Sequence, residues 1–389
     1  MLGGIQPGSD IYNIMLTGQP ISIYLGQALL GTNAVMNGSM QVWQRNTTWA
    51  AIATNTVTAD RWKYRKFVTG AVHTADRSVD TPGSVVGGSW DAGNTGFVYS
   101  LKLTCTTADA SVGSTDAVIL QNVIEGPTHW HKYANQKLTL SFWVKSTITG
   151  TYCVALNNNP SQALSFVAEY TVNAADVWEK KIINIPAYTG EWSASDHLQL
   201  TFCLMAGSGY QGAANAWTAQ SQIYATANQV NACSTAVSNT FLLTGVQLQL
   251  GDKATAFYHL DLTMERNQCM RYYEKSFQYA TVPAYGVTWT QGNPAIGVQV
   301  VAASTMQRLA ATAQFMIEKR IAADGSNTIA YNPVTASSAQ VYNITDAEDC
   351  SSTALQSAST KAVTWQAVTP AGSSAGQLLA LHWTTDAEI

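Results

Sequence analysis

The chain has 389 residues, of which 46% are apolar and 11% are charged, and its net charge is −4. Soluble domains usually carry roughly 25% charged residues, so uncharged polar side chains must cover much of this surface. That composition suits a protein that packs against neighbours in an assembly. It excludes a basic nucleic-acid-binding protein, because the Lys and Arg residues are few and scattered. The length suits two or three domains.

Residues 1–33 have the pattern of an irregular arm, since Gly, Pro, Asn and Ser interrupt every apolar run. The alternation of Ile21, Ile23 and Leu25 predicts one short strand. No charge occurs in residues 11–44, but the apolar runs are only a few residues long. A membrane-spanning helix needs about 20 nearly continuous apolar residues, so no membrane insertion is expected. Met1 is not followed by a basic segment, and no signal peptide is expected.

Residues 34–259 alternate apolar and polar side chains, as half-buried antiparallel strands require. In residues 138–145 the apolar face alternates with an outward face that contains Trp143. In residues 198–204 the outward face contains Cys203, and the inward face consists of Leu198, Leu200, Phe202 and Leu204. Clusters of turn residues separate such runs. The pattern predicts an all-β, two-sheet sandwich of jelly-roll type.

The triplet Asp60-Arg61-Trp62 lies near the start of this region. We expect Asp60 and Arg61 to form an ion pair that closes the first strand over the core. Trp62 is expected to be a packing anchor in that core.

Residues 260–278 break the two-residue period and predict a connecting helix. Thr263 is its expected N-cap. The side chains at helical spacing are Leu262, Arg266, Cys269, Met270, Tyr273 and Phe277.

Residues 279–389 return to two-residue alternation and predict a smaller C-terminal β domain. The clearest runs are Ile296, Val298 and Val300; Val363, Trp365 and Ala367; and Leu379, Leu381 and Trp383. The chain is therefore expected to consist of an arm (1–33), a sandwich (34–259), a helix (260–278) and a second β domain (279–389).

Five parts of the sequence stand out in order: residues 37–45 with 58–62, 138–146, 178–186, 244–257 and 269–276. Their order and spacing resemble a group of bacteriophage virion proteins described as tail-fibre or minor structural proteins. The resemblance covers roughly residues 34–277. One departure is Gln249, at a strand position where the group usually has Glu.

The resemblance implies a carbohydrate-binding-like jelly roll, a short helix and a variable β tail, outside a virion and usually in a trimeric fibre. It implies that the protein is made in the host cytoplasm and joins other phage virion proteins. We take the arm as the attachment segment, with Ile11, Tyr12, Ile21, Ile23, Tyr24 and Leu25 as its assembly residues. A tail fibre for host attachment is the first expectation. The alternatives are a head decoration, head fibre or tail adaptor, and a secreted carbohydrate-binding module.

No catalytic, cofactor or metal site is expected from the sequence. Glycoside hydrolysis needs two carboxyl groups about 5–10 Å apart, and nothing in the sequence pairs the available carboxylates: Glu125, Glu169, Asp176, Glu179, Glu191 and Asp196. His129 and His131 lack a third ligand at a recognisable spacing and are interpreted as exposed loop residues. The six cysteines show no CxxC spacing, and neither zinc nor a disulfide framework is expected.

Sugar binding is the functional site that the sequence supports best. Aromatic rings stack on sugar faces, and four Trp and Tyr residues lie on an outward strand face or in loops. A host-surface glycan is therefore a candidate partner. For each ring, packing in the core or at a subunit interface is the stronger alternative. The candidates are Trp143, Trp130, Tyr210 and Trp217.

Overall fold

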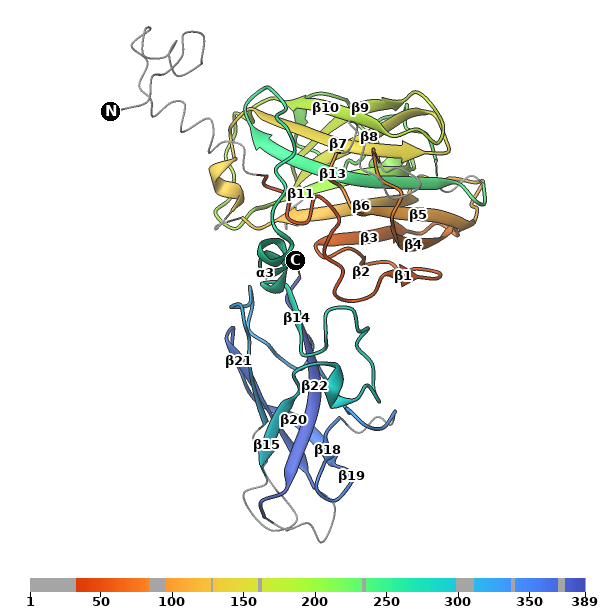
Figure 1. The fold of residues 1–389 in the computed structure, drawn as a ribbon. Coiled ribbons are helices and arrows are strands. Elements are labelled where there is room, and N and C mark those ends of the chain that lie inside the picture. The colour runs from red at the N-terminus through yellow and green to blue at the C-terminus, as the bar shows by residue number, and fades with distance from the viewer. Residues whose placement is uncertain are drawn as a thin grey trace, which may run out of the picture.

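The computed structural model describes residues 33–83, 95–126, 129–159, 163–232, 236–298, 311–336, 340–369 and 375–388. The predicted assembly residues of the arm lie outside this part of the chain. Within it, nearly all regular structure is β, in antiparallel sheets (Figure 1). The prediction of an all-β protein with a jelly-roll sandwich is confirmed.

The sandwich consists of a six-stranded and a seven-stranded sheet among the described residues. The six-stranded sheet has the order β1 (Thr48–Trp49), β4 (Val72–Ser78), β5 (Ser100–Thr107), β13 (Thr240–Leu250), β7 (Leu138–Ser146) and β10 (Glu179–Ile185). The seven-stranded sheet has the order β12 (Trp217–Thr218), β9 (Ser165–Val172), β8 (Gly150–Asn159), β11 (His197–Ala206), β6 (Ala117–Ile124), β3 (Trp62–Phe67) and β2 (Thr56–Val57).

The core lies between these two sheets and is built from the alternating side chains that the sequence predicts. Leu140 and Phe142 of β7 face Leu200 and Phe202 of β11 in one buried cluster. Cys203 occupies the outward face of β11, as predicted, yet it is completely buried. The chain around Tyr224 covers this face and forms a second apolar cluster with it.

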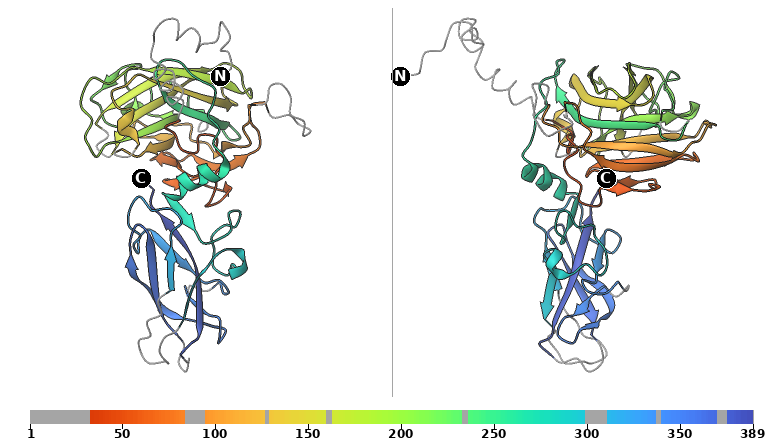
Figure 2. Two further views of the ribbon diagram at one scale, coloured as in Figure 1. Left: turned by 60° about the vertical axis from the view of Figure 1, so that its left-hand side comes forward. Right: turned by 45° about the vertical axis from the view of Figure 1, so that its right-hand side comes forward.

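Helix α3 (Leu262–Met270) follows the sandwich and is shorter than the predicted helix. Its N-cap is Asp261, whose carboxylate accepts a hydrogen bond from the backbone N–H of Thr263, so the prediction of Thr263 as N-cap was wrong. Tyr273, predicted to be helical, begins strand β14 (Tyr273–Lys275), because this segment pairs with residues 384–386. Figure 2 shows α3 and β14 between the sandwich and the remaining strands in both views.

The C-terminal sheets are organised by one strand, β22 (Leu378–Asp386). It pairs with β14, β15 (Ala295–Val298), β17 (Thr328–Tyr331) and β18 (Tyr342–Asn343), which also pairs with β19 (Glu348–Asp349). A three-stranded sheet has the order β16 (Ala311–Gln314), β21 (Ala362–Val368) and β20 (Ser351–Ala358).

A separate buried cluster lies between these C-terminal sheets and contains Val363, Trp365, Leu379 and Leu381. The domain boundaries at residues 33/34, 259/260 and 278/279 stay predictions. Short 3-10 turns complete the described structure: η1 (Trp130–Lys132), η2 (Ser208–Tyr210) and η3 (Trp289–Gln291). No helix among the described residues is long and apolar enough to cross a bilayer.

Candidate functional site

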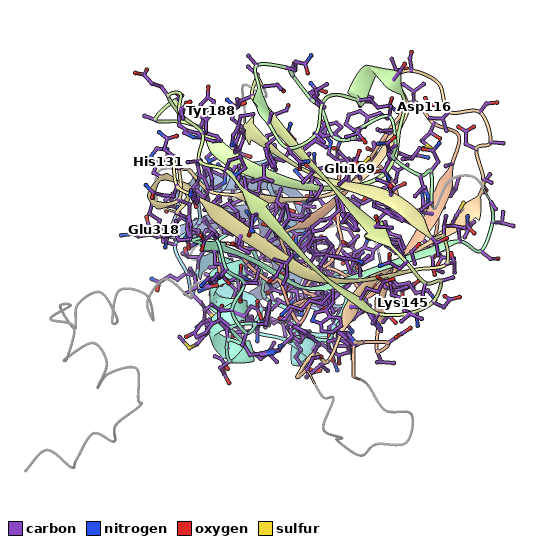
Figure 3. All side chains as sticks on the ribbon, turned by 90° about the horizontal axis from the view of Figure 1, so that it is seen from above. Asp116, His131, Lys145, Glu169, Tyr188 and Glu318 are labelled. Carbon is purple, nitrogen blue, oxygen red and sulfur yellow. The ribbon has the colours of Figure 1, made fainter. Side chains whose placement is uncertain are left out.

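Aromatic side chains gather at one end of the sandwich, where the turn η1, the loop between β10 and β11 and the edge strand β12 meet. Trp192, in the loop between β10 and β11, lies 5.0 Å from Trp130 of η1 and 5.9 Å from Trp217 of β12, measured between ring centroids. The ring of Tyr188 lies 6.0 Å from Trp192 and 5.6 Å from Trp217. We call these four residues the aromatic edge. Figure 3 shows Tyr188 and the neighbouring His131 on the same side of the sandwich.

A hollow of about 380 Å³ lies against the aromatic edge. Trp192 supplies its aromatic surface, and the polar side chains that line it are those of His131, Asn135 and Glu191. These three polar residues are exposed, whereas Trp192 is half-buried. An aromatic face beside imidazole, amide and carboxylate groups can stack on a sugar ring and bond to its hydroxyls.

Two of the four predicted glycan-contact residues therefore meet here, although they are far apart in the sequence. Trp130 is only 1% exposed, so its ring packs against Trp192 and does not contact a ligand directly. Trp217 is half-buried, and its indole N–H donates to the carbonyl of Pro186 at 2.9 Å. Sequence reasoning missed Tyr188 and Trp192. The signal available was two aromatics flanking Gly190 and Glu191 in a loop between strands.

The other two candidates lie elsewhere on the sandwich. Trp143 is half-buried on the outer face of the six-stranded sheet, in register with Lys180 and Thr244. Tyr210 packs on the outer face of the other sheet, 5.4 Å from the ring of Phe67. Neither ring belongs to the aromatic edge, and glycan contact by either stays a prediction.

Four of the six carboxylates weighed for catalysis accept hydrogen bonds, whereas Asp176 and Glu191 are exposed. Glu125 accepts hydrogen bonds from Arg271 Nη2 at 2.8 Å and Tyr272 Oη at 2.7 Å. Burial opposes ionisation of Glu125, but these bonds outweigh it and lower its pKa to about 2. Hydrogen-bond donors also hold Glu169, Glu179 and Asp196.

The histidines of η1 do not form part of a metal cluster in the described chain. His131 is exposed, as predicted, whereas His129 is half-buried. Burial, reinforced by the charge of Lys132, lowers the pKa of His129 to about 4. No group of three or more His, Cys, Asp or Glu side chains in the described ranges is placed to hold a metal ion.

Several of the segments that carry the resemblance meet in one buried joint beside α3. The Asn37 amide donates to the carbonyls of Val42 and Asp60, both at 2.9 Å, and accepts from the Val42 N–H at 2.9 Å. The Trp62 indole donates to the Asn37 carbonyl at 2.9 Å. Gly38 has no room for a side chain, since a Cβ there would lie 2.1 Å from the Val246 carbonyl oxygen.

Charged side chains continue this joint into the C-terminal sheets. Arg45 donates to Asp386 at 2.8 Å, and its guanidinium lies 3.9 Å from the centroid of the Tyr273 ring. Arg61 forms an ion pair with Glu388 and stacks over Tyr272. The predicted pair between Asp60 and Arg61 was therefore wrong.

Asp60 and Arg61 do not pair with each other because each contacts a different buried partner. Asp60 accepts from the backbone and side chain of Gln44, at 3.1 and 2.5 Å. Burial raises the pKa of Asp60 to about 6. Trp62 is a fully buried core residue, as expected.

Gln249, at the position of the departure, holds the turn that follows its strand. Its amide donates to the Lys253 carbonyl at 2.9 Å, and its oxygen accepts from the Thr255 hydroxyl at 2.9 Å. These bonds tie the turn after β13 to the strand.

No protein-family model matches the sequence, and no curated protein matches it. Among solved structures, a CBM4 module is 12% identical and covers 56% of this chain and 99% of its own, with a TM-score of 0.28. Tailspike protein 4 of bacteriophage CBA120 is 11% identical and covers 52% of this chain but 21% of its own, with a TM-score of 0.28. A family 11 carbohydrate-binding module from Clostridium thermocellum is 11% identical over 54% of this chain and 99% of its own, with a TM-score of 0.27. Similarity at these scores supports no functional assignment.

Proposed function

We propose that this chain is a non-enzymatic structural protein of a phage particle, in a trimeric tail fibre that attaches to a host glycan through the aromatic edge. The observation that carries the proposal is the convergence of the resemblance segments on a buried joint. Asn37, Gly38, Asp60 and Trp62 all have a role in holding the chain together, and none lines an open site. The segments that resemble virion proteins thus hold the chain together in this structure, which supports an architectural role.

The contacts of Glu125 support the non-enzymatic part of the proposal. A hydrolytic pair needs one carboxyl group that keeps or accepts a proton near neutral pH. Glu125 is instead held ionised by Arg271 and Tyr272. Sugar binding without cleavage is the chemistry that the hollow beside Trp192 supports.

Replacement of Trp192 tests the glycan-binding part. On an array of bacterial surface oligosaccharides, we expect Trp192→Ala to weaken binding at least about fivefold, because truncating an aromatic anchor at the centre of a site costs more than about 1 kcal/mol. Trp289→Ala is the matched control, since Trp289 is 40% exposed and lies in η3, away from the sandwich.

Glu191→Ala provides a second variant if Trp192→Ala disturbs the packing of Trp130. Binding that survives both substitutions unchanged would reject the aromatic edge as the glycan site. Circular dichroism of each variant checks that the fold is intact.

Electron cryo-microscopy of purified particles tests the virion part. Trimers projecting from the tail are the expected result. Copies spread over the capsid would instead show a head decoration, and a ring within the tail would show an adaptor. Absence of the chain from purified particles would reject the virion assignment.

A further inference from the structure

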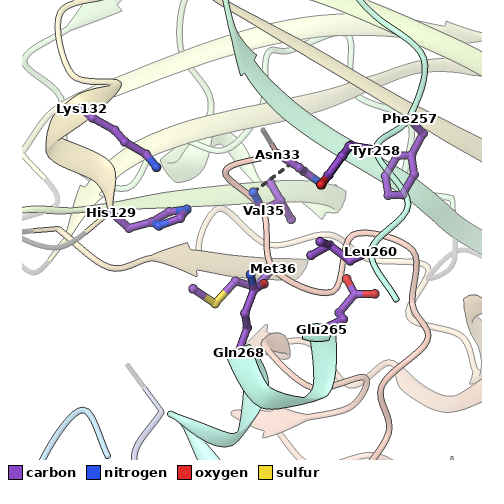
Figure 4. A pocket seen from close by; sticks show the side chains of 10 residues that line it. All are labelled: Asn33, Val35, Met36, His129, Lys132, Phe257, Tyr258, Leu260, Glu265 and Gln268. Carbon is purple, nitrogen blue, oxygen red and sulfur yellow. Dashed lines mark hydrogen bonds between the residues drawn. The ribbon is translucent and has the colours of Figure 1, made fainter. Parts of the chain in front are cut away.

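We propose that a second pocket, between η1, the segment after β13 and helix α3, binds one acidic sugar residue, a sugar ring that carries a carboxylate. The pocket has a volume of about 290 Å³. Ligand sites usually span about 300–1,000 Å³, so a single ring with its substituents suits this one. Figure 4 shows side chains from all three segments around it.

One side of the pocket carries the ammonium group of Lys132 and the imidazole ring of His129. Lys132 lines the pocket and is exposed, and it takes part in none of the ion pairs between described residues. The Nε2 atom of His129 is buried and has no hydrogen-bond partner within the described chain. Lys132 can therefore meet the carboxylate of a ligand with its ammonium group, and the unpartnered Nε2 atom of the neutral His129 ring leaves a polar atom beside it for a ligand hydroxyl.

Helix α3 supplies side chains of the opposite character. Glu265 is 4% exposed, and one of its carboxylate oxygens accepts from the Ser39 hydroxyl at 2.9 Å. Gln268 lies one turn further along the helix and is exposed. A carboxylate and an amide are acceptors for sugar hydroxyls. Figure 4 shows Lys132 and Glu265 on opposite sides of the pocket, so a ring with its acid group toward Lys132 presents hydroxyls to Glu265.

Aromatic side chains complete the pocket. Phe257 and Tyr258 line it, and Tyr258 is 53% exposed. Their rings offer an apolar surface to the C–H face of a sugar. The ammonium group of Lys132 favours an acidic sugar over a neutral one, and Glu265 with the two rings favours a sugar acid over a small carboxylate such as acetate.

This pocket goes beyond the proposed function. The turn η1 separates it from the aromatic edge, since Lys132 and His129 line the pocket whereas His131 lines the hollow beside Trp192. A negative binding result at one site therefore does not decide whether the other site binds its ligand.

The test is titration of the full chain at pH 7 with glucuronate, glucose and acetate, followed by saturation-transfer NMR. We expect glucuronate to bind more tightly than glucose or acetate. Lys132→Gln should weaken glucuronate binding about tenfold or more, because it removes a charge-assisted contact. Lys180→Gln is the matched control, since Lys180 is an exposed lysine of β10 outside the pocket.

Gln268→Ala, on the exposed side of α3, should also weaken glucuronate binding, whereas Trp192→Ala should not change it. Equal affinity for glucose and glucuronate, equal affinity for acetate, or an unchanged affinity in Lys132→Gln would each overturn the proposal. Loss of array binding in Trp192→Ala with unchanged glucuronate binding would support both sites separately.

Discussion

At the scale of single residues, the joint between the sandwich and the C-terminal sheets depends on buried charged side chains. Buried charges need partners, because their desolvation is costly. Glu125 is an example: it follows β6 of the sandwich and is bound by Arg271 and Tyr272, which lie between α3 and β14. Its three hydrogen bonds favour the ionised form.

The lowered pKa of Glu125 predicts a specific pH dependence. The folded-state pKa is about 2, below the ordinary value of 4.5. The contribution of Glu125 to stability is therefore complete above pH 4.5 and is lost as the pH falls toward 2. We expect Glu125→Gln to lower the free energy of unfolding by about 1–3 kcal/mol at pH 7 and to flatten its pH dependence in that window.

Urea unfolding at several pH values measures this dependence. Glu348→Gln, at an exposed position, is the control and should keep the wild-type slope. An identical slope in Glu125→Gln and wild type would contradict the assignment.

At the scale of elements, α3 depends on its cap more than on its own amphipathicity. Only Glu265, Cys269 and Met270 of the helix are buried. The carboxylate of Asp261 accepts from the Thr263 N–H at 2.8 Å and satisfies one of the free donors at the helix start.

Loss of this cap gives the next prediction. Asp261→Ala should destabilise the protein by about 1 kcal/mol, because Asp261 is exposed and the cap is its principal contact. Thermal unfolding measures the change, with Asp252→Ala in an exposed turn as the control. Equal melting temperatures for the two variants would show that the cap does not stabilise α3.

The strands of the sandwich could be predicted from sequence, whereas the end of α3 could not. In residues 138–146 the core itself imposes the two-residue period, so the pattern is local. Tyr273 and Phe277 happen to continue the helical spacing, but Tyr273 pairs with Asp386, a contact that no local pattern reveals. The aromatic edge could not be predicted from the sequence for the same reason, since only the fold brings Trp130 and Trp192 together.

At the scale of the whole molecule, the same joint makes the sandwich and the C-terminal sheets depend on each other. Arg61 of the sandwich and Glu388 form an ion pair whose side chains are 2% and 9% exposed. Arg320 adds hydrogen bonds to the carbonyls of Ala387 and Glu388, at 2.8 and 3.0 Å. The segment after β22 is thus held from both sides.

Breaking this pair should uncouple the two parts. Removing one partner of a buried ion pair costs about 3–5 kcal/mol, so Glu388→Ala should split or broaden the heat-absorption peak in scanning calorimetry. Lys361→Gln is the control, because Lys361 and Glu318 form an exposed pair worth about 0–1 kcal/mol. A single unshifted peak in Glu388→Ala would show that the joint does not couple them.

Because β22 follows its partner strands in the sequence, those strands can pair with it only late in synthesis. Its four partner strands among the described residues, β14, β15, β17 and β18, all precede it in the sequence. At translation speeds of about 5–20 residues per second, β14 waits about 5–20 s after leaving the ribosome before β22 emerges. The sandwich can fold during that wait, while β14, β15 and β17 still lack their partner β22 and can be reached by a chaperone or a neighbouring nascent chain.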